Sequence, residues 1–155
     1  MSVTVHVCTD IDASLKATWS AIEHVETHVD WMADAESIRF TTPAHAGVGT
    51  QFECVTAVGP IRLVDVMSIT DWEPEATMGV EHRGVVTGTG RFTLRAIDGD
   101  RTRFCWAEQL TLPLSLGGRV GERFAQPILT RLWKGNLARL KQSVERDHVA
   151  SGLSQ

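Results

Sequence analysis

The chain has 155 residues, of which 43% are hydrophobic and 22% charged, and its formal net charge is −4. This length and composition predict one globular domain over residues 1–155 and exclude a disordered or collagen-like chain. The acidic balance argues against a protein that binds the phosphate backbone of nucleic acids. No apolar run is long enough to span a bilayer, and the first residues alternate instead of forming a signal-peptide block, so a cytoplasmic protein is expected.

The N-terminal part of the chain predicts one strand followed by two short helices. Residues 3–7 alternate between valine and polar side chains, as in a half-buried strand. Asp12 or Ser14 can cap the following helix, because their side-chain oxygens accept hydrogen bonds from its first amides. The apolar face of that helix comprises Leu15, Trp19 and Ile22. A second short helix is expected over residues 28–34, with Trp31 turned inward.

The middle of the chain predicts an antiparallel meander. Its strands are expected to begin at Ile38 and to continue over residues 50–58, 61–72, 77–83, 85–97 and 102–112. The connections between them contain Gly-Pro, Glu-Pro-Glu and Asp-Gly-Asp, which are typical of tight turns. Short connections of this kind join antiparallel neighbours in a sheet.

Residues 118–148 predict one long helix with apolar side chains at helical spacing. The expected stripe comprises Val120, Phe124, Ile128, Leu132, Leu137, Leu140 and Val144. Pro127 is expected to kink this helix or to break off its first part. Seven basic and three acidic residues lie between positions 119 and 148, and we interpret this excess as a solvated face in preference to a membrane or nucleic-acid surface.

Three ionisable residues share the inward parity of apolar neighbours on the predicted strands: Asp65, His82 and Glu108. A three-residue hairpin loop at residues 98–100 places Glu108 opposite Gly90, and a similar turn places His82 near Gly88. The glycines leave space between the two side chains, so we predict that Glu108 and His82 meet inside the protein, with Asp65 nearby. The alternative is that the glycines only bend the sheet and that a bulge turns the charges toward water.

The cysteines and histidines do not predict a metal site. Cys8, Cys54 and Cys105 are odd in number and widely spaced, and we interpret them as buried, reduced thiols. His24 and His28 are four residues apart, but the glutamate that follows the first histidine of a zinc-protease motif is absent. We interpret these histidines as part of a polar helix face.

The predicted order of elements, β-α-α-β6-α, resembles the START-like, or SRPBCC, helix-grip superfamily. Within it, the sequence is most similar to the bacterial polyketide cyclase/dehydrase branch over residues 3–145. Five segments carry the resemblance: HVETHVDWM (24–32), VEHRG (80–84), GTGRF (88–92), FCWAEQLTLP (104–113) and RLWKGNLARL (131–140). They match in spacing, and none is a catalytic signature. The resemblance implies an α+β fold in which a curved seven-stranded antiparallel sheet wraps a long C-terminal helix.

The resemblance also implies a cavity between sheet and helix that binds a small hydrophobic molecule, such as a lipid, polyketide or quinone. The expected lining comprises Trp31, Phe52, Met67, Met78, Val80, His82, Trp106, Glu108, Phe124 and Ile128. We expect the cavity to open near residues 59–60, the turn at Gly84, or residues 113–118. No cofactor is expected, and the protein is expected to be a monomer or homodimer.

Two alternative functions remain. The first is a cofactor-independent polyketide cyclase or dehydratase, with His82 as general acid or base and Glu108 or Asp65 orienting it. Aromatic cyclases of the family often use tyrosine and arginine in the cavity; this chain has no tyrosine, and Arg91 and Arg95 have outward parity. The second is an interaction module without a ligand, such as a chaperone co-factor or a membrane-associated adaptor, whose cavity is filled by side chains.

Overall fold

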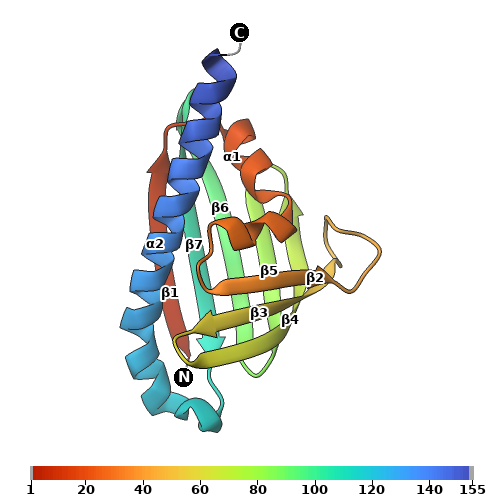
Figure 1. Ribbon diagram of the computed structural model, residues 1–155, viewed down its shortest axis with the longest axis vertical. Helices are drawn as coiled ribbons and strands as arrows, with labels where there is room; N and C mark the ends of the chain where they lie inside the picture. The colour runs from red at the N-terminus through yellow and green to blue at the C-terminus, as the bar shows by residue number, and fades with distance from the viewer. Residues whose placement is uncertain (1, 154–155) are drawn as a thin grey trace.

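Seven antiparallel strands form one curved sheet, and a long helix lies against it (Figure 1). The computed structural model describes residues 2–153. The strands are β1 (Val3–Ile11), β2 (Ala35–Phe40), β3 (Gln51–Val58), β4 (Ile61–Glu73), β5 (Thr77–Gly84), β6 (Thr87–Asp98) and β7 (Arg101–Thr111). Their order in the sheet is β1-β7-β6-β5-β4-β3-β2. The predicted fold class, a helix-grip architecture, is therefore confirmed.

The predicted inward and outward faces of β7 are also confirmed. Phe104 and Trp106 of β7 are buried, whereas Arg103, which directly precedes Phe104, is exposed. Trp106 lies opposite Phe92 in the β6–β7 ladder, as predicted. The loop itself is one residue shorter than predicted, because Asp98 belongs to β6, and a register shift just before Asp98 restores the predicted pairing. Since side chains alternate along a strand, this register fixes which residues of both strands face the helix.

Short helices cover one end of the sheet. Helix α1 (Leu15–Ile22) begins at Ser14, whose Oγ accepts a hydrogen bond from the amide of Ala17 at 3.2 Å. The next segment is a 3-10 helix, η1 (Val25–Asp30), which begins and ends earlier than the predicted helix over residues 28–34. Nε2 of the buried His28 donates to the carbonyl of Ile22 at 2.7 Å, and this bond ties η1 to the end of α1.

The C-terminal helix α2 (Gly118–Leu153) follows the short 3-10 helix η2 (Leu114–Leu116) and continues through Pro127 without a break. Pro127 is exposed, so water can satisfy the carbonyl that loses its intrahelical partner. The predicted apolar stripe is correct only for the C-terminal part of α2. Its buried positions there are Trp133, Leu137, Leu140 and Val144, whereas Val120, Phe124 and Ile128 are exposed.

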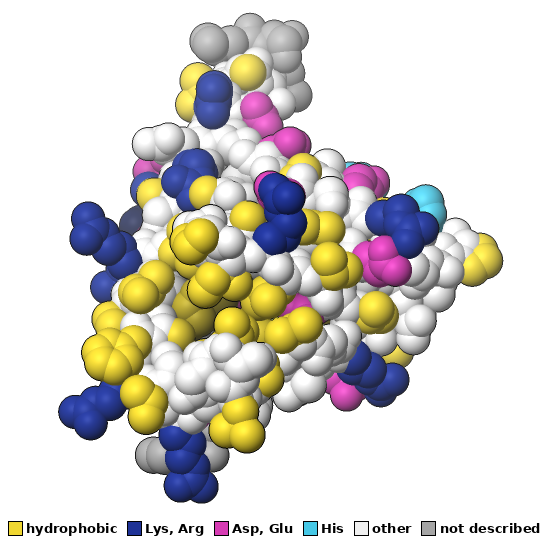
Figure 2. Space-filling model, turned by 60° about the horizontal axis from the view of Figure 1, so that its bottom comes forward, with side chains coloured by type: hydrophobic (Ala, Val, Ile, Leu, Met, Phe, Trp, Pro, Cys, Tyr) yellow, Lys and Arg dark blue, Asp and Glu magenta, His cyan; other side chains and the backbone are white. Residues whose placement is uncertain are grey.

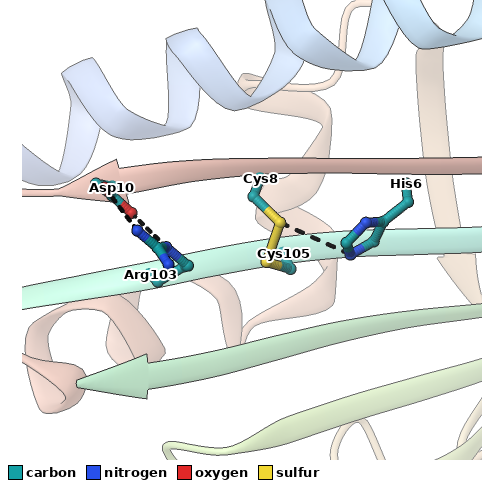
Figure 3. The surroundings of a disulfide bond; sticks show 5 residues. All are labelled: His6, Cys8, Asp10, Arg103 and Cys105. Carbon is teal, nitrogen blue, oxygen red and sulfur yellow. Dashed lines mark hydrogen bonds and ion pairs between the residues drawn. A yellow bond between two sulfur atoms is a disulfide. The ribbon is translucent and has the colours of Figure 1, made fainter. Parts of the chain in front are cut away.

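The interpretation of all three cysteines as reduced thiols is wrong for two of them. Cys8 on β1 and Cys105 on β7 lie directly opposite each other, with Cα atoms 4.1 Å apart, and form a disulfide (Figure 3). Both have the outward parity of their strands, so this bond lies on the outer face of the sheet. Cys54 is buried and free, as expected.

Candidate functional site

A cavity of about 560 Å³ lies between the inner face of the sheet and α2. Figure 2 shows a hollow surrounded by hydrophobic side chains on this side of the molecule. The predicted residues that line it are Phe52, Met67, Met78, Val80, His82, Trp106, Glu108, Phe124 and Ile128. Trp31 does not line the cavity. It is buried behind the wall and packs edge-on against Trp106, with ring centroids 6.1 Å apart.

The mouth of the cavity is apolar. Phe124 and Ile128 of α2 line it and are 68% and 56% exposed, which places them at the rim. Ile61, at the turn between β3 and β4, lines the opposite side and is also partly exposed. Ser115 of η2 completes this end of the lining. Two predicted entrance segments, residues 59–60 and 113–118, therefore flank the mouth.

Glu108 is a buried carboxylate in the wall of the cavity. It lies two residues after Trp106 on β7, and its Oε1 accepts a hydrogen bond from Trp106 Nε1 at 2.9 Å. Gly90 lies directly opposite on β6, and a Cβ at that position would stand 2.9 Å from Glu108 Oε1. The glycine therefore provides the space that the carboxylate occupies.

His82 approaches the same carboxylate from β5. Its Nε2 lies 3.7 Å from Glu108 Oε1, and both side chains are 8% exposed. Burial disfavours the charged imidazole, but Glu108 and, more weakly, Asp65 outweigh burial and raise the pKa of His82. Nε2 has no hydrogen-bond partner among residues 2–153. The predicted meeting of His82 and Glu108 thus takes place, and it leaves the buried Nε2 of His82 available to a ligand.

Asp65 lines the cavity on β4 and has a bond of its own. Its Oδ1 accepts a hydrogen bond from the amide of Val86 at 3.4 Å, which attaches β4 to the turn between β5 and β6. Its partner in the β4–β5 ladder is Gly84, where a Cβ would lie 2.2 Å from Oδ1. The neighbour of His82 on β4 is Met67, so Asp65 acts on His82 through its charge.

Two further titratable groups in the wall are neutral. Burial lowers the pKa of His28 to about 4, although the bond to Ile22 acts in the opposite direction. Burial likewise raises the pKa of Cys54 to about 11, and the carboxylates of Asp34, Asp65 and Glu108 add to that effect. His28 is therefore a structural hydrogen-bond donor, and the hypothesis of a shared polar face with His24 does not describe it.

Sequence reasoning predicted Phe124 and Ile128 of α2 in the lining but missed two residues further along this helix. Trp133 lines the cavity and stacks on Trp106, with ring centroids 4.7 Å apart and planes inclined by 19°. Asn136, one helical turn further, is fully buried; its Oδ1 accepts from the amide of Ala33 and its Nδ2 donates to Asp34. A polar residue beside the apolar stripe was the available signal for this connection.

Comparisons with known proteins bear on the fold. No family model matches the sequence, and a search of curated proteins finds no significant match. The structure resembles the Zhui aromatase/cyclase from Streptomyces sp. R1128 with a TM-score of 0.81, at 13% identity over 98% of this chain and 99% of that one. It resembles a START superfamily protein from Mycobacterium smegmatis with a TM-score of 0.68, at 13% identity over 93% of this chain and 95% of that one.

A third similar structure contains two domains. The di-domain ARO/CYC StfQ of the steffimycin biosynthetic pathway matches with a TM-score of 0.75, at 10% identity over 97% of this chain and 52% of that one. At identities this low, the structural similarity shows a common fold and nothing more specific. Among residues 2–153, no helix is long and apolar enough to cross a bilayer.

Proposed function

We propose that this chain, which has the START-like helix-grip fold, binds a small hydrophobic molecule with an oxygen function in the cavity. The observation that carries the proposal is an apolar cavity of about 560 Å³ with a buried His82–Glu108 pair in its wall. Ligand sites of this size are typically apolar with a few polar groups that fix orientation. Lipids, polyketides and quinones have this chemistry.

The apolar wall supplies affinity without selecting a chemical group. Burial of apolar surface contributes about 25 cal/mol per Å², so each ~200 Å² removed from water yields about 5 kcal/mol before entropic costs. Met67 and Met78 are unbranched and adapt to irregular shapes. The exposed side chains of Phe124 and Ile128 extend the apolar surface to the mouth, where they can contact an entering ligand.

The polar pair supplies orientation. Glu108 already accepts the hydrogen of Trp106 Nε1, whereas His82 Nε2 has no partner within the described chain. The raised pKa of His82 favours the protonated imidazole, which is a donor at both nitrogens. A carbonyl or hydroxyl oxygen of the ligand is the matching acceptor.

The test uses two rigid ligands of nearly equal shape, 9-fluorenone and fluorene, which differ by a carbonyl oxygen. His82→Leu is expected to weaken fluorenone binding about tenfold, equivalent to ~1.4 kcal/mol, and to leave fluorene binding unchanged. Glu81→Gln is the matched control. Glu81 directly precedes His82 on β5, so its side chain points to the other face of the sheet, where it pairs with Arg83 at 3.0 Å. Affinities are measured by titration calorimetry, after native mass spectrometry for any co-purified molecule.

Two results would contradict the proposal. Purified protein without a bound organic molecule, together with no thermal shift from fluorenone, a fatty acid, a sterol or an aromatic polyketide, excludes ligand binding. Equal losses of fluorenone and fluorene affinity in His82→Leu exclude the orienting role of His82.

A cofactor-independent cyclase or dehydratase is the second candidate, favoured by the same His82–Glu108 pair. In a dehydration, a protonated His82 donates its proton to a departing hydroxyl while a base removes the proton from the neighbouring carbon, so that one water leaves and a C=C bond forms. The raised pKa of His82 suits the acid role. Loss of water from a β-hydroxyketone, followed by mass spectrometry with wild type and His82→Gln, tests this candidate.

The remaining hypothesis, an interaction module without a ligand, requires side chains to fill the space between sheet and helix. The cavity argues against it. We further propose a cytoplasmic location and a monomeric or homodimeric state. Size-exclusion chromatography with light scattering tests the oligomeric state.

A further inference from the structure

A second cluster of reactive side chains lies on the outer face of the sheet, remote from the cavity (Figure 3). It consists of His6 and Cys8 on β1 and Cys105 on β7, whose ligand atoms all lie within 4.8 Å of one another. His6 and Cys8 are two residues apart and share a face of their strand, and Cys105 is the direct ladder partner of Cys8.

We propose that reduction of the Cys8–Cys105 disulfide creates a surface site for a zinc-class d¹⁰ metal ion, held by both thiolates and the His6 imidazole. Two soft sulfur ligands with one imidazole are a ligand set that zinc prefers. Water takes the fourth position of the tetrahedron. The oxidised protein cannot bind the ion at this site, because sulfurs joined in a disulfide are not thiolate ligands.

The present distances are close to those of a tetrahedral site. Cys8 Sγ lies 3.7 Å from His6 Nε2. A sulfur at about 2.3 Å and a nitrogen at about 2.1 Å from one tetrahedral ion stand about 3.6 Å apart, so this pair already has the required separation. The two sulfurs must move from bonding distance to about 3.8 Å, and rotation of their side chains provides that movement while the β1–β7 ladder holds the backbone.

The surroundings of the site provide no fourth protein ligand from the neighbouring Asp10. Asp10 is the next outward residue on β1, but Arg103 holds both of its carboxylate oxygens, at 2.9 and 3.3 Å. That ion pair also lowers the pKa of Asp10, chiefly through the hydrogen bond from Arg103. His6 and Cys8 are exposed, so an ion and its water ligand can reach the site from solvent. The two thiolate charges neutralise a divalent ion.

The reaction balances with a dithiol as reductant. The dithiol gives two electrons and two protons to the protein disulfide and itself becomes a cyclic disulfide. Binding of the metal ion then releases the two thiol protons, because the ligands are thiolates. An oxidised disulfide reagent reverses the step: it takes two electrons from the thiolates and is itself reduced to thiolates, the protein disulfide forms again, and the ion is released.

The experiment compares oxidised and reduced wild-type protein, with the reductant removed under anaerobic conditions. Zinc is titrated against a chromophoric chelator, and Co²⁺ is used as a spectroscopic probe. We expect one ion per reduced chain, none per oxidised chain, and sulfur-to-cobalt charge-transfer absorption in the reduced protein alone. Cys8→Ser and Cys105→Ser should abolish binding, and His6→Ala should weaken it at least tenfold. Cys54→Ser is the matched control and should bind as wild type, because Cys54 is buried on the opposite face.

Circular dichroism establishes whether each variant is folded. If a cysteine variant does not fold, reduced wild type whose exposed thiols have been alkylated takes its place in the titration. Reduced, folded wild type that takes up no zinc overturns the proposal. Equal uptake by oxidised protein or by Cys8→Ser also overturns it, as does unchanged affinity in His6→Ala.

Discussion

At the scale of single residues, Glu108 opposes the effect of burial on the pKa of His82. Glu108→Gln removes the charge and keeps an oxygen that accepts the Trp106 hydrogen bond. Burial then acts with less opposition, so the pKa of His82 should fall below its wild-type value, as measured by NMR titration of the imidazole. Since a raised histidine pKa stabilises the fold below about pH 6.5 and less so above it, the advantage of wild type over Glu108→Gln should shrink as the pH rises.

Glu108→Leu provides the control for this prediction. If only the burial of a charge mattered, leucine would be neutral or stabilising. It also leaves the N–H of Trp106 without an acceptor, at a cost of about 1–3 kcal/mol. Leucine should therefore destabilise the protein more than glutamine in urea unfolding. The reverse order would show that the Trp106–Glu108 bond contributes little.

His28 predicts the opposite pH dependence. Its pKa is lowered from 6.5 to about 4, so the unfolded chain binds more protons between these values and stability falls as the pH decreases through this window. At 1.36 kcal/mol per unit, the loss between pH 7 and pH 4 is about 3 kcal/mol. His28→Gln should be less stable at pH 7 and lose less on acidification, as followed by chemical unfolding at several pH values. An equal acid dependence in both proteins would contradict the assignment.

At the scale of elements, strand β6 contains two glycines, Gly88 and Gly90, at which a side chain would meet different neighbours. Gly88 has φ +146°, and a Cβ there would lie 2.0 Å from the backbone oxygen of Gln109. A Cβ at Gly90 would meet the movable end of Glu108, at 2.9 Å. Gly88→Ala should thus cost about 2 kcal/mol or more in thermal unfolding, because backbone must move. Gly90→Ala should cost about 1 kcal/mol or less and shift the pKa of His82, because it displaces the carboxylate. Equal destabilisation would refute this division.

Helix α2 shows what periodicity leaves open. The spacing of Phe124, Ile128, Leu137 and Leu140 identifies an apolar face, but not what covers it. Leu137 and Leu140 pack on the sheet, whereas Phe124 and Ile128 line a cavity and remain exposed. The sequence therefore predicted the helix, its C-terminal contacts and a cavity-lining role for Phe124 and Ile128, but periodicity did not separate these exposed positions from the buried ones.

At the scale of the whole molecule, the sequence predicted pairings between consecutive strands but not the pairing between strands far apart in the chain. Consecutive strands from β2 to β7 are neighbours, so short connections restrict their register, and parity then brings His82 to Glu108. Pairing between β1 and β7 has no such turn. The disulfide between Cys8 and Cys105 depends on that pairing, which explains why the cysteines were interpreted separately.

The disulfide closes a loop with a sequence separation of 97 residues. A link of this length restricts the unfolded chain, so reduction should lower the free energy of unfolding by about 2–4 kcal/mol. The β1–β7 ladder extends from Val3 to Ile11 and should keep the reduced protein folded. Calorimetry with and without a reductant measures the difference, and Cys8→Ser should reproduce the reduced value. A melting temperature that does not respond to the reductant would show that the bond adds no stability.

The sheet order also determines when each strand can find its partner during synthesis. Strand β1 leaves the ribosome before the other six strands, yet its ladder partner β7 and the helix that packs on it are synthesised much later. Strands β2 to β7 can pair one after another as they emerge, since each follows its neighbour. Val3, Val5 and Val7, buried in the finished protein, must wait in solvent until β7 emerges. The nascent chain therefore exposes this apolar segment through most of its translation and is prone to non-native contacts until β7 emerges.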